Sequence, residues 1–505
     1  MKKIYIYALA CALTAISCQD NEWGADSATP QAPEIEIPMG AADGELLIKF
    51  VPEMSDILDQ TLTRVGGVAT RSGIPSTDEV LNILGAYHFE RVFPVDPKTE
   101  KRTREAGMHL WYIVRFDKDT DLKEAARQLR KLGEISKIQS NPTIRRAYDP
   151  KKKPLYLSAS DLQHVTRTSE GLTFNDPGLK HQWHYQNTGS YDFVKEGAEA
   201  IAGADVNCGE AWKLCKGDPT IIVAVLDEGV MWNHPDLIGN MWTNEAEEIG
   251  STEDKDGNGY KGDRYGYNFV KNTGVISWTS AEDTGHGTHV AGTIAAVNGN
   301  NKGVGGIAGG DGTENSGVKI MTCQLFDGAY GCTLAAEAKA IKYAADNGAV
   351  ILQCSWGYNS PDANEALGYT PGPKDEQDWE NQYPLEKEAL DYFIHNAGSP
   401  NGVIDGGLAI FASGNEYAPS SSYPAGYSKC ISVSAIAADF TPSSYTNYGE
   451  EITLCAPGGD GDYYGTPGVA DDEFAWEGKT QGLILSTAIK NGQPAYAYME
   501  GTSMA

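Results

Sequence analysis

The stretch Asp283-Thr-Gly-His286-Gly-Thr-His289-Val-Ala-Gly292-Thr-Ile-Ala-Ala296 places a histidine between two glycines, just before a run of small and apolar residues. This run predicts a buried helix that packs closely against a sheet and presents the His286 imidazole on its first turn. A Gly-His-Gly sequence by itself is more typical of a buried helix with incidental histidines. Three other segments of the chain favour the functional interpretation.

These three segments place polar side chains at or near the ends of apolar runs. Ile-Ile-Val-Ala-Val-Leu-Asp227 predicts a strand buried on both faces, and the carboxyl ends of such parallel strands are where functional sites gather. Leu-Ala-Ile-Phe-Ala-Ser-Gly-Asn415 predicts a second buried strand, and Gly-Thr-Ser503-Met-Ala closes the sequence. An acid, a histidine and a serine in this order follow one of the known chain orders of a catalytic triad.

Together the segments resemble the four signature segments of the subtilisin-like serine peptidases. They read Val225-Leu-Asp227-Glu-Gly, Gly285-His286-Gly-Thr-His-Val-Ala-Gly, Ser413-Gly-Asn415 and Gly501-Thr-Ser503-Met-Ala. Four independent segments in the right order are far more specific than any single motif. The resemblance covers residues 175–505 and implies a subtilisin-like α/β fold with a mostly parallel sheet flanked by helices. The alternation of predicted strands and helices independently indicates such a sheet.

The resemblance also implies how the reaction proceeds. A serine hydroxyl is a poor nucleophile at neutral pH, so Ser503 needs a neighbouring base, and His286 would accept its proton. Asp227 would orient the imidazole and stabilise the imidazolium that forms during attack. Asn415 and the backbone amide of Ser503 would donate hydrogen bonds to the oxyanion. The expected activity is hydrolysis of peptide bonds through an acyl-enzyme, with no cofactor required.

Two further segments bear on binding. His289 lies one helical turn beyond His286 and is expected to be structural; the His-x-x-His spacing also suits zinc, but the adjacent glutamate of the zinc-protease helix is absent. Ser355-Trp356-Gly357 resembles the segment of the family that binds substrate, where an extended peptide pairs with a strand edge. The polar residues 358–382 that follow predict an inserted loop, either near the cleft or neutral on the surface.

The segment from Asp254 to Asp263 begins like a calcium-binding loop. Oxygen-bearing side chains stand at Asp254, Asp256 and Asn258, a glycine follows for the turn, and Asp263 lies further on. The twelfth position, however, is Tyr265 rather than glutamate. A structural Ca²⁺ site and an ordinary turn rich in glycine and aspartate both remain open.

The first residues have the features of an export signal. Met1 is followed by two lysines and then a short apolar run, and Ala15-Ile-Ser-Cys18 resembles a bacterial lipobox with alanine where leucine is commoner. Lipidation of Cys18, which would anchor the protein in the cell envelope, and plain secretion are the two alternatives. The body of the chain has no other run of about 18 apolar residues, so membrane contact is expected only through the lipid anchor.

The segments between the signal and the peptidase-like region predict a tether, a small domain and a linker. Residues 19–44 are rich in Ala, Pro, Gly and acids and predict a tether. The pattern predicts strands at 45–51, 86–93, 109–116 and 135–142 and helices at 55–62 and 121–132. Two strand-helix-strand halves predict a ferredoxin-like unit within 45–149. Its position resembles that of the inhibitory propeptides of the family; the alternative is a binding domain that stays attached. Residues 150–174 predict an exposed linker where maturation cleavage would fall.

Length and composition set further limits. A chain of 505 residues is long enough for two or three domains, and its net charge of −29 argues against nucleic acid as a partner. Beyond the signal the cysteines are odd in number and lack metal-ligand spacing, which predicts mostly buried thiols and at most one or two disulfides. These cysteines are Cys208, Cys215, Cys323, Cys332, Cys354, Cys430 and Cys455.

Two hypotheses about function follow. The first is an exported serine endopeptidase, made as a proenzyme, that acts on proteins or peptides and is inhibited by its own propeptide. The second is a non-catalytic relative that binds peptides. In the family the serine opens a long buried helix, whereas this sequence stops at Ala505, so the sequence is expected to be a fragment.

Overall fold

The computed structural model describes residues 35–461 and 482–505, apart from 36, 39, 66–67, 70, 147, 149–153, 158–173, 190–199 and 399–403. The expected signal, Cys18, most of the tether and most of the linker therefore lie outside the described residues. Within the described part, no helix has the length and apolar character needed to cross a membrane.

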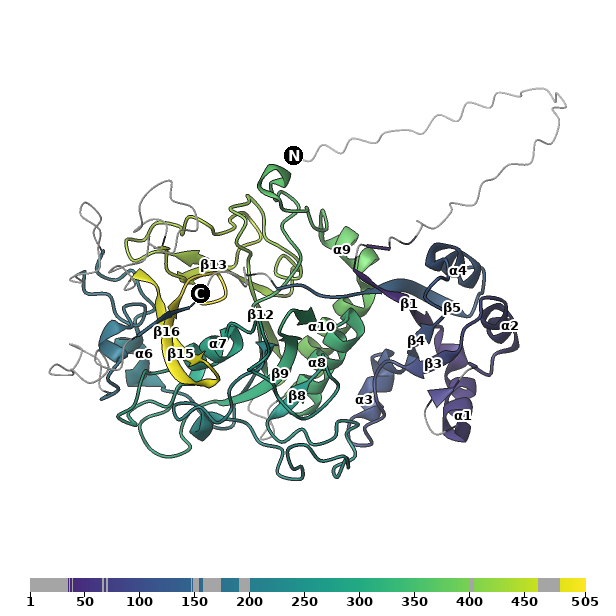
Figure 1. Cartoon of the computed structure of the whole chain (residues 1–505), viewed down its shortest axis with the longest axis horizontal. Helices are drawn as coiled ribbons and strands as arrows, with labels where there is room; N and C mark the ends of the chain where they lie inside the picture. The colour runs from purple at the N-terminus through teal and green to yellow at the C-terminus, as the bar shows by residue number, and fades with distance from the viewer. Residues whose placement is uncertain are drawn as a thin grey trace, which may run out of the picture. The chain divides into compact units, whose positions relative to one another are not determined.

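An antiparallel sheet and its helices form an N-terminal domain (Figure 1). Its strands, in the spatial order β2-β3-β4-β1-β5, are β1 (Ala41–Phe50), β2 (Val68–Ala69), β3 (His88–Arg91), β4 (Trp111–Arg115) and β5 (Ile135–Pro142). Its helices are α1 (Ser55–Val65), α2 (Pro75–Ile83), α3 (Glu100–Glu105) and α4 (Leu122–Leu129). Without the short edge strand β2, the order is that of the predicted ferredoxin-like unit. The sequence pattern did not predict α2 or α3, and β1 begins before the expected end of the tether.

The second domain, here called the C-terminal domain, is built on a mostly parallel sheet. The spatial order is β10-β9-β7-β11-β12-β13-β14, with β8 also paired to β9, and only the β10–β9 pair is antiparallel. The strands are β7 (Ile222–Glu228), β8 (Gly266–Asn268), β9 (Lys319–Asp327), β10 (Tyr330–Gly331), β11 (Ile351–Cys354), β12 (Leu408–Ala412), β13 (Ile431–Ile436) and β14 (Leu454–Pro457). The helices are α6 (Cys208–Leu214), α7 (His286–Ala295), α8 (Leu334–Asp346), α9 (Glu376–Gln382) and α10 (Pro384–Asn396). This architecture confirms the predicted fold class.

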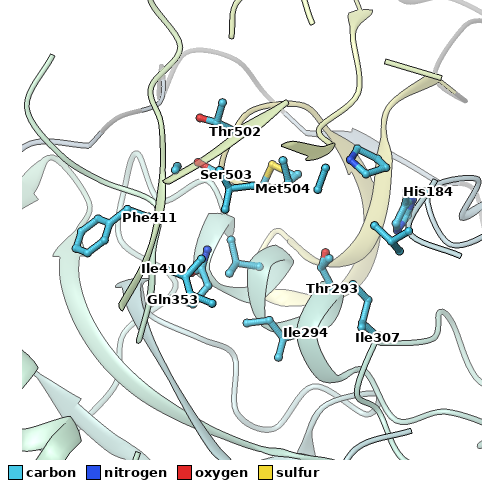
Figure 2. Close-up of a pocket in the computed structure, with 17 residues that line it drawn as sticks. His184, Thr293, Ile294, Ile307, Gln353, Ile410, Phe411, Thr502, Ser503 and Met504 are labelled. Carbon is cyan, nitrogen blue, oxygen red and sulfur yellow. The ribbon is translucent and has the colours of Figure 1, made fainter. Parts of the chain in front are cut away.

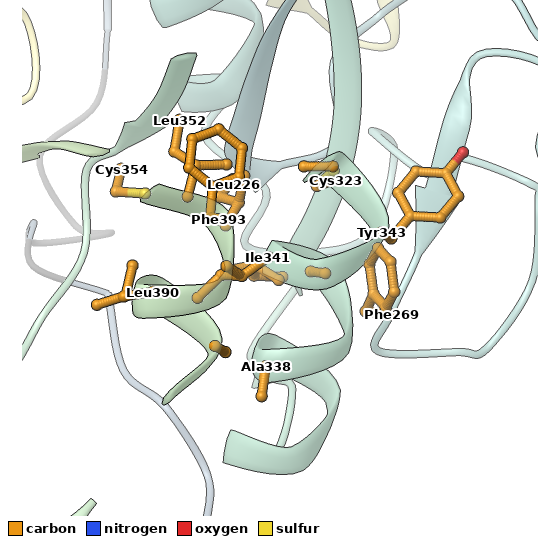
Figure 3. Packing of buried hydrophobic residues seen from close by; sticks show 14 of the residues in the cluster. Leu226, Phe269, Cys323, Ala338, Ile341, Tyr343, Leu352, Cys354, Leu390 and Phe393 are labelled. Carbon is orange, nitrogen blue, oxygen red and sulfur yellow. The ribbon is translucent and has the colours of Figure 1, made fainter. Parts of the chain in front are cut away.

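Strand β7 separates two apolar cores because its side chains alternate between the two faces of the sheet. Ala224 and Leu226 belong to the larger core, which contains residues of α8 and α10 (Figure 3). Val223 and Val225 belong to a second core, which contains residues of α7. Helices therefore cover both faces of the sheet, and β7 is buried along its whole length, as its continuous apolar sequence predicts.

Smaller features depart from the sequence-based expectations. The predicted loop 358–382 contains α9. Strand β6 (Leu155–Tyr156), within the expected linker, pairs with the hairpin formed by β15 (Ile484–Lys490) and β16 (Gln493–Met499). Most of the cysteines beyond the signal are buried, as predicted; Cys215 and Cys455 are exposed, and all of those in the described part are free thiols.

The N-terminal domain lies against α8 and α10. On β5, the Gln139 side chain accepts a hydrogen bond from the Leu385 amide at the start of α10, and Asn141 accepts one from the Ala335 amide at the start of α8. Arg102 of α3 donates to the carbonyls of Ala345 and Asn396, at the opposite ends of the same two helices. Backbone groups at helix ends lack partners within the helix, so these contacts fasten the two domains together.

Candidate active site

The carboxyl end of β7 and the first turn of α7 bring two of the predicted triad residues together. His286 Nδ1 lies 2.9 Å from both carboxylate oxygens of Asp227, and both side chains are buried. The helix starts at His286 because Gly285 adopts a left-handed backbone conformation, with φ of 78°. Gly287 allows the close approach, since a Cβ atom there would lie 2.2 Å from the Glu228 carbonyl oxygen.

Glu228, which follows Asp227, holds the start of α7 in place. Its Oε2 atom accepts hydrogen bonds from the backbone amides of Thr284 at 3.0 Å, Gly285 at 2.9 Å and His286 at 3.1 Å. A carboxylate at a helix N-terminus satisfies the unpaired amides and interacts favourably with the helix dipole. The buried Glu228 therefore fixes the position of the His286 backbone relative to β7.

Ser503 lies on a turn after Gly501, whose φ is 146°. It is buried, and the Ser355 hydroxyl donates to its carbonyl oxygen over 3.4 Å. Neither Ser503 Oγ nor His286 Nε2 has a hydrogen-bond partner among the residues described. The structure thus joins Asp227 to His286 and leaves the two atoms between which a proton would pass unpaired.

Asn415 follows β12, as predicted from the sequence. Its Oδ1 atom accepts hydrogen bonds from the Thr502 amide at 3.0 Å and the Thr502 hydroxyl at 2.9 Å. This contact ties Asn415 to the residue before Ser503. Because the oxygen end of the amide faces Thr502, the nitrogen end, which is the donor, is directed away from it.

A cavity of about 140 Å³ lies beside Ser503 (Figure 2). Its lining is mostly apolar and includes Ile294 of α7, Phe411 of β12 and Met504. His184 is its one ionisable side chain, and burial lowers the pKa of His184 to about 3, so the imidazole is neutral. Asp227 and His286 are not among the residues that line this cavity.

The described residues after β5, here called the tail (residues 143–146 and 148), lead from the N-terminal domain to His286. The Ile144 amide donates to the Cys332 carbonyl at 2.9 Å, and Arg146 forms an antiparallel bridge with Trp356. The ring of Tyr148 stacks on the His286 ring, with centroids 3.7 Å apart and an angle of 8° between planes. The tail therefore follows the predicted Ser355-Trp356-Gly357 segment and covers the imidazole.

Three carboxylates of the C-terminal domain lie close together. Glu247, Asp256 and Asp263 offer oxygen atoms that all lie within 4.8 Å of one another. Burial, with a smaller contribution from Asp256, raises the pKa of Asp263 to about 6. A set of oxygen donors carrying like charges is the chemistry that Ca²⁺ prefers, so these residues fit the ion.

This acidic group overlaps only in part with the predicted calcium ligands. Asp256 and Asp263 belong to it, whereas Asp254 accepts hydrogen bonds from the amides of Gly257 and Gly259. The Asn258 amide group donates to Asp263. Glu247 was not predicted, because it lies before the loop in sequence and no local spacing connects it to the others.

His289 has the structural position predicted for it. It is fully buried, and its Nε2 atom lies 3.0 Å from the carbonyl oxygens of both Ile484 and Ala497. Burial, followed by the charge of His286, lowers the pKa of His289 to about 3. The neutral ring connects α7 to the β15–β16 hairpin.

The sequence analysis missed three residues of this site: Glu228, Arg146 and Tyr148. Glu228 had a detectable signal, because a second acid directly after the predicted catalytic acid stands at the end of a buried strand. Arg146 and Tyr148 lie at the end of the predicted N-terminal domain, and their contacts with Glu228 and His286 depend on the tertiary fold.

Comparison with known proteins agrees with this geometry. The sequence model of the subtilase family, peptidase S8, matches residues 218–505. The chain belongs to the subtilase family. It is 31% identical over 309 residues to halolysin of Haloferax mediterranei, covering 61% of this chain and 47% of halolysin.

Two other relatives cover similar shares of this subtilase. The halolysin-like extracellular serine protease Nep of Natrialba magadii is 30% identical over 261 residues, 52% of this chain and 38% of the relative. A calcium-dependent protease of Nostoc sp. is 28% identical over 313 residues, 60% of this chain and 37% of the relative. The chain thus spans less than half the length of these three relatives.

Proposed function

We propose that this subtilase is a serine endopeptidase that uses Asp227, His286 and Ser503 as its triad. The observation that carries the proposal is the buried Asp227–His286 pair at 2.9 Å, in a chain that belongs to the subtilase family. The similar relative Nep is named a serine protease. A peptide-binding protein would have no use for a carboxylate that orients an imidazole whose second nitrogen is unpaired.

The chemistry follows from the proton positions. Asp227 accepts the Nδ1 proton of His286, so the unpaired Nε2 atom is the basic nitrogen. Nε2 takes the proton of Ser503 as the hydroxyl oxygen attacks the carbonyl carbon of the substrate. His286 then gives this proton to the leaving amine, and water later hydrolyses the acyl-enzyme by the same steps in reverse order.

The oxyanion of the tetrahedral intermediate needs donors in fixed positions. We assign this role to the side-chain amide of Asn415 and the backbone amide of Ser503. The hydrogen bonds from Thr502 to Asn415 support the assignment, since they orient the amide from the residue adjacent to the nucleophile.

We infer that the N-terminal domain acts as an inhibitory propeptide. Substrate cannot reach the imidazole while Tyr148 stacks on His286 and the tail is bridged to Trp356. Cleavage in the tail or in the expected linker 150–174 would allow the tail to leave the cleft. The contacts at the ends of α8 and α10 would then hold the domain only non-covalently.

Export and calcium complete the proposal. The signal-like first residues and the similarity to Nep, which is named an extracellular protease, support an exported enzyme, either anchored through lipidated Cys18 or secreted. The similarity to a calcium-dependent protease and the acidic group Glu247, Asp256 and Asp263 support a structural Ca²⁺ ion. Such an ion would neutralise the three carboxylates and has no part in the reaction steps.

Labelling with a fluorophosphonate probe tests the proposed activity. The full-length protein should react with the probe and should release an N-terminal fragment that ends between residues 143 and 174. Ser503→Ala and His286→Ala should each abolish both labelling and release. Absence of labelling in a folded protein from which the N-terminal domain has been removed would instead support a non-catalytic, peptide-binding subtilase.

A further inference from the structure

The Arg146 side chain fills a pocket beside the triad. Its guanidinium lies 3.2 Å from Glu228 Oε1, donates to the carbonyl oxygen of Glu282 over 3.3 Å, and donates to the carbonyl oxygen of Gly328. It also lies over the ring of Phe326, 5.6 Å from the centroid. The Arg146 side chain is 10% exposed and that of Glu228 is 1% exposed, so the ion pair is largely removed from water.

The polar groups that contact the Arg146 side chain, Glu228 and the carbonyls of Glu282 and Gly328, belong to the C-terminal domain, while the ring of Tyr148 in the tail lies 5.7 Å from the guanidinium. Glu228 Oε2 is held by the amides of Gly285 and His286, while Oε1 faces the guanidinium. Amides of the α7 start therefore hold the carboxylate in addition to its ion pair with the tail. The pocket offers one carboxylate and two carbonyl oxygens, and these are acceptors only. A guanidinium, with five N–H donors in a planar group, matches such a set better than a single ammonium does.

The pocket distinguishes between two adjacent arginines. Arg145 is exposed, whereas Arg146 enters the pocket at the residue bridged to Trp356. Tyr148, two residues further along, covers His286. A peptide that follows the same path as the tail would therefore place its arginine two residues before the residue that lies against His286.

We propose that Glu228 is a specificity-determining residue, and that this enzyme selects protein substrates with an arginine at the position that pairs with Trp356. The inference rests on the proposed peptidase function and adds a substrate class to it. In the uncleaved chain Arg146 occupies this site. The tail therefore inhibits in two ways, because Arg146 fills the arginine pocket and Tyr148 covers the imidazole.

Peptides based on residues 141–150 test the preference for arginine, with the enzyme that results when the full-length protein has processed itself. Replacing the arginine equivalent to Arg146 with glutamine should lower kcat/KM at least about 30-fold, the lower end of the effect of removing one partner of a buried charge pair. The same change at Arg145 should lower it less than about threefold, and lysine at the Arg146 position should give an intermediate value.

Enzyme variants identify the residue responsible. In the Glu228→Gln variant, kcat/KM for the arginine peptide should exceed kcat/KM for the glutamine peptide by no more than about threefold. Glu282→Gln is the matched control, since its exposed side chain lies nearby and only its main-chain carbonyl contacts Arg146, so the preference for the arginine peptide should persist. Hydrolysis without preference for arginine, or a preference that survives Glu228→Gln, overturns the inference and leaves the proposed function intact.

A second measurement does not need catalysis. In Ser503→Ala protein, Arg146→Gln and Glu228→Gln should each lower Tm, and the double variant should lower it by less than the sum, whereas Arg145→Gln and Glu228→Gln should be additive. If the effects are non-additive here and the protein with Ser503 intact hydrolyses no peptide, the proposed peptidase function is refuted and the pocket remains an arginine-binding site. Additivity for Arg146 would refute the pocket.

Discussion

Asp227 and Glu228 show how two adjacent acids take different roles at the end of one strand. Asp227 lies 2.9 Å from His286 Nδ1, whereas Glu228 accepts hydrogen bonds from the amides that start α7. The sequence predicted the role of Asp227 because the surrounding motif is specific. It did not predict the ion pair between Glu228 and Arg146, because Arg146 comes from another domain and no local pattern connects the two residues.

Substitution of Asn415 tests the oxyanion site. Asn415→Ala should lower kcat about 100- to 1000-fold with little change in KM, because the donor acts on charge that develops only in the transition state; this magnitude comes from a subtilisin. Thr502→Val should have a smaller effect, since it removes one of two hydrogen bonds that orient the amide. Steady-state kinetics measures both. A decrease of less than tenfold for Asn415→Ala would contradict the assignment.

Helices α8 and α10 show which parts of an element the sequence can predict. Helix α8 (Leu334–Asp346) coincides with an alanine-rich stretch of the sequence, because local periodicity sets the span of such a helix. The contacts that fasten its ends come from Asn141 and Arg102 of the other domain, and the pattern gives no sign of them. Likewise the predicted triad residues were identified from contiguous motifs, whereas the tail over His286 and the acidic group with Glu247 depend on contacts between distant segments.

The first turns of these two helices bury an acid each. Glu386 accepts hydrogen bonds from Trp379 Nε1 at 2.6 Å and the Tyr358 hydroxyl at 3.2 Å. Neither carboxyl oxygen of Glu337 has a hydrogen-bond partner within the described part of the chain. Burial, and then the charge of Glu386, raises the pKa of Glu337 well above its usual range. Below the unfolded-state pKa the Glu337 carboxyl is protonated in both the folded and the unfolded chain, so its ionisation does not affect folding stability. As the pH rises above that value, the carboxyl ionises in the unfolded chain first, and folding stability falls.

Replacement of Glu337 tests this effect. Glu337→Met should raise the free energy of unfolding by about 1–3 kcal/mol both at pH 8 and near pH 4.5, because it removes a buried polar group without partners. The gain should be larger at pH 8 than near pH 4.5, because at pH 8 the unfolded wild-type chain is also stabilised by ionisation of Glu337. Denaturant unfolding of Ser503→Ala protein across this pH range measures the difference. Glu365→Met, at an exposed position, is the control and should show no pH-dependent gain. An equal effect at both pH values would show that Glu337 is not the titrating group.

At the scale of the molecule, the two domains share one apolar core. Val92, Phe93 and Trp111 of the N-terminal domain belong to the same cluster as α8, α10 and the central sheet. The acidic group lies beside this shared core, because Asp263 accepts a hydrogen bond from Tyr343 of α8 and Lys98 of the N-terminal domain lies 3.3 Å from Asp256. An ion bound there would therefore stabilise both domains and the contact between them.

Removal of calcium tests this coupling. A ligand at 100 times its Kd stabilises the folded state by about 2.7 kcal/mol, so a chelator should lower the Tm of Ser503→Ala protein measurably at pH 8. Protons compete with the metal for Asp263, whose pKa is raised to about 6, so the calcium effect should fade below about pH 6. Glu247→Gln should abolish the dependence on calcium, whereas Glu248→Gln, whose side chain is 80% exposed, should retain it. A Tm that is independent of calcium at pH 8 would show that the three carboxylates are held by their hydrogen bonds and Lys98 alone.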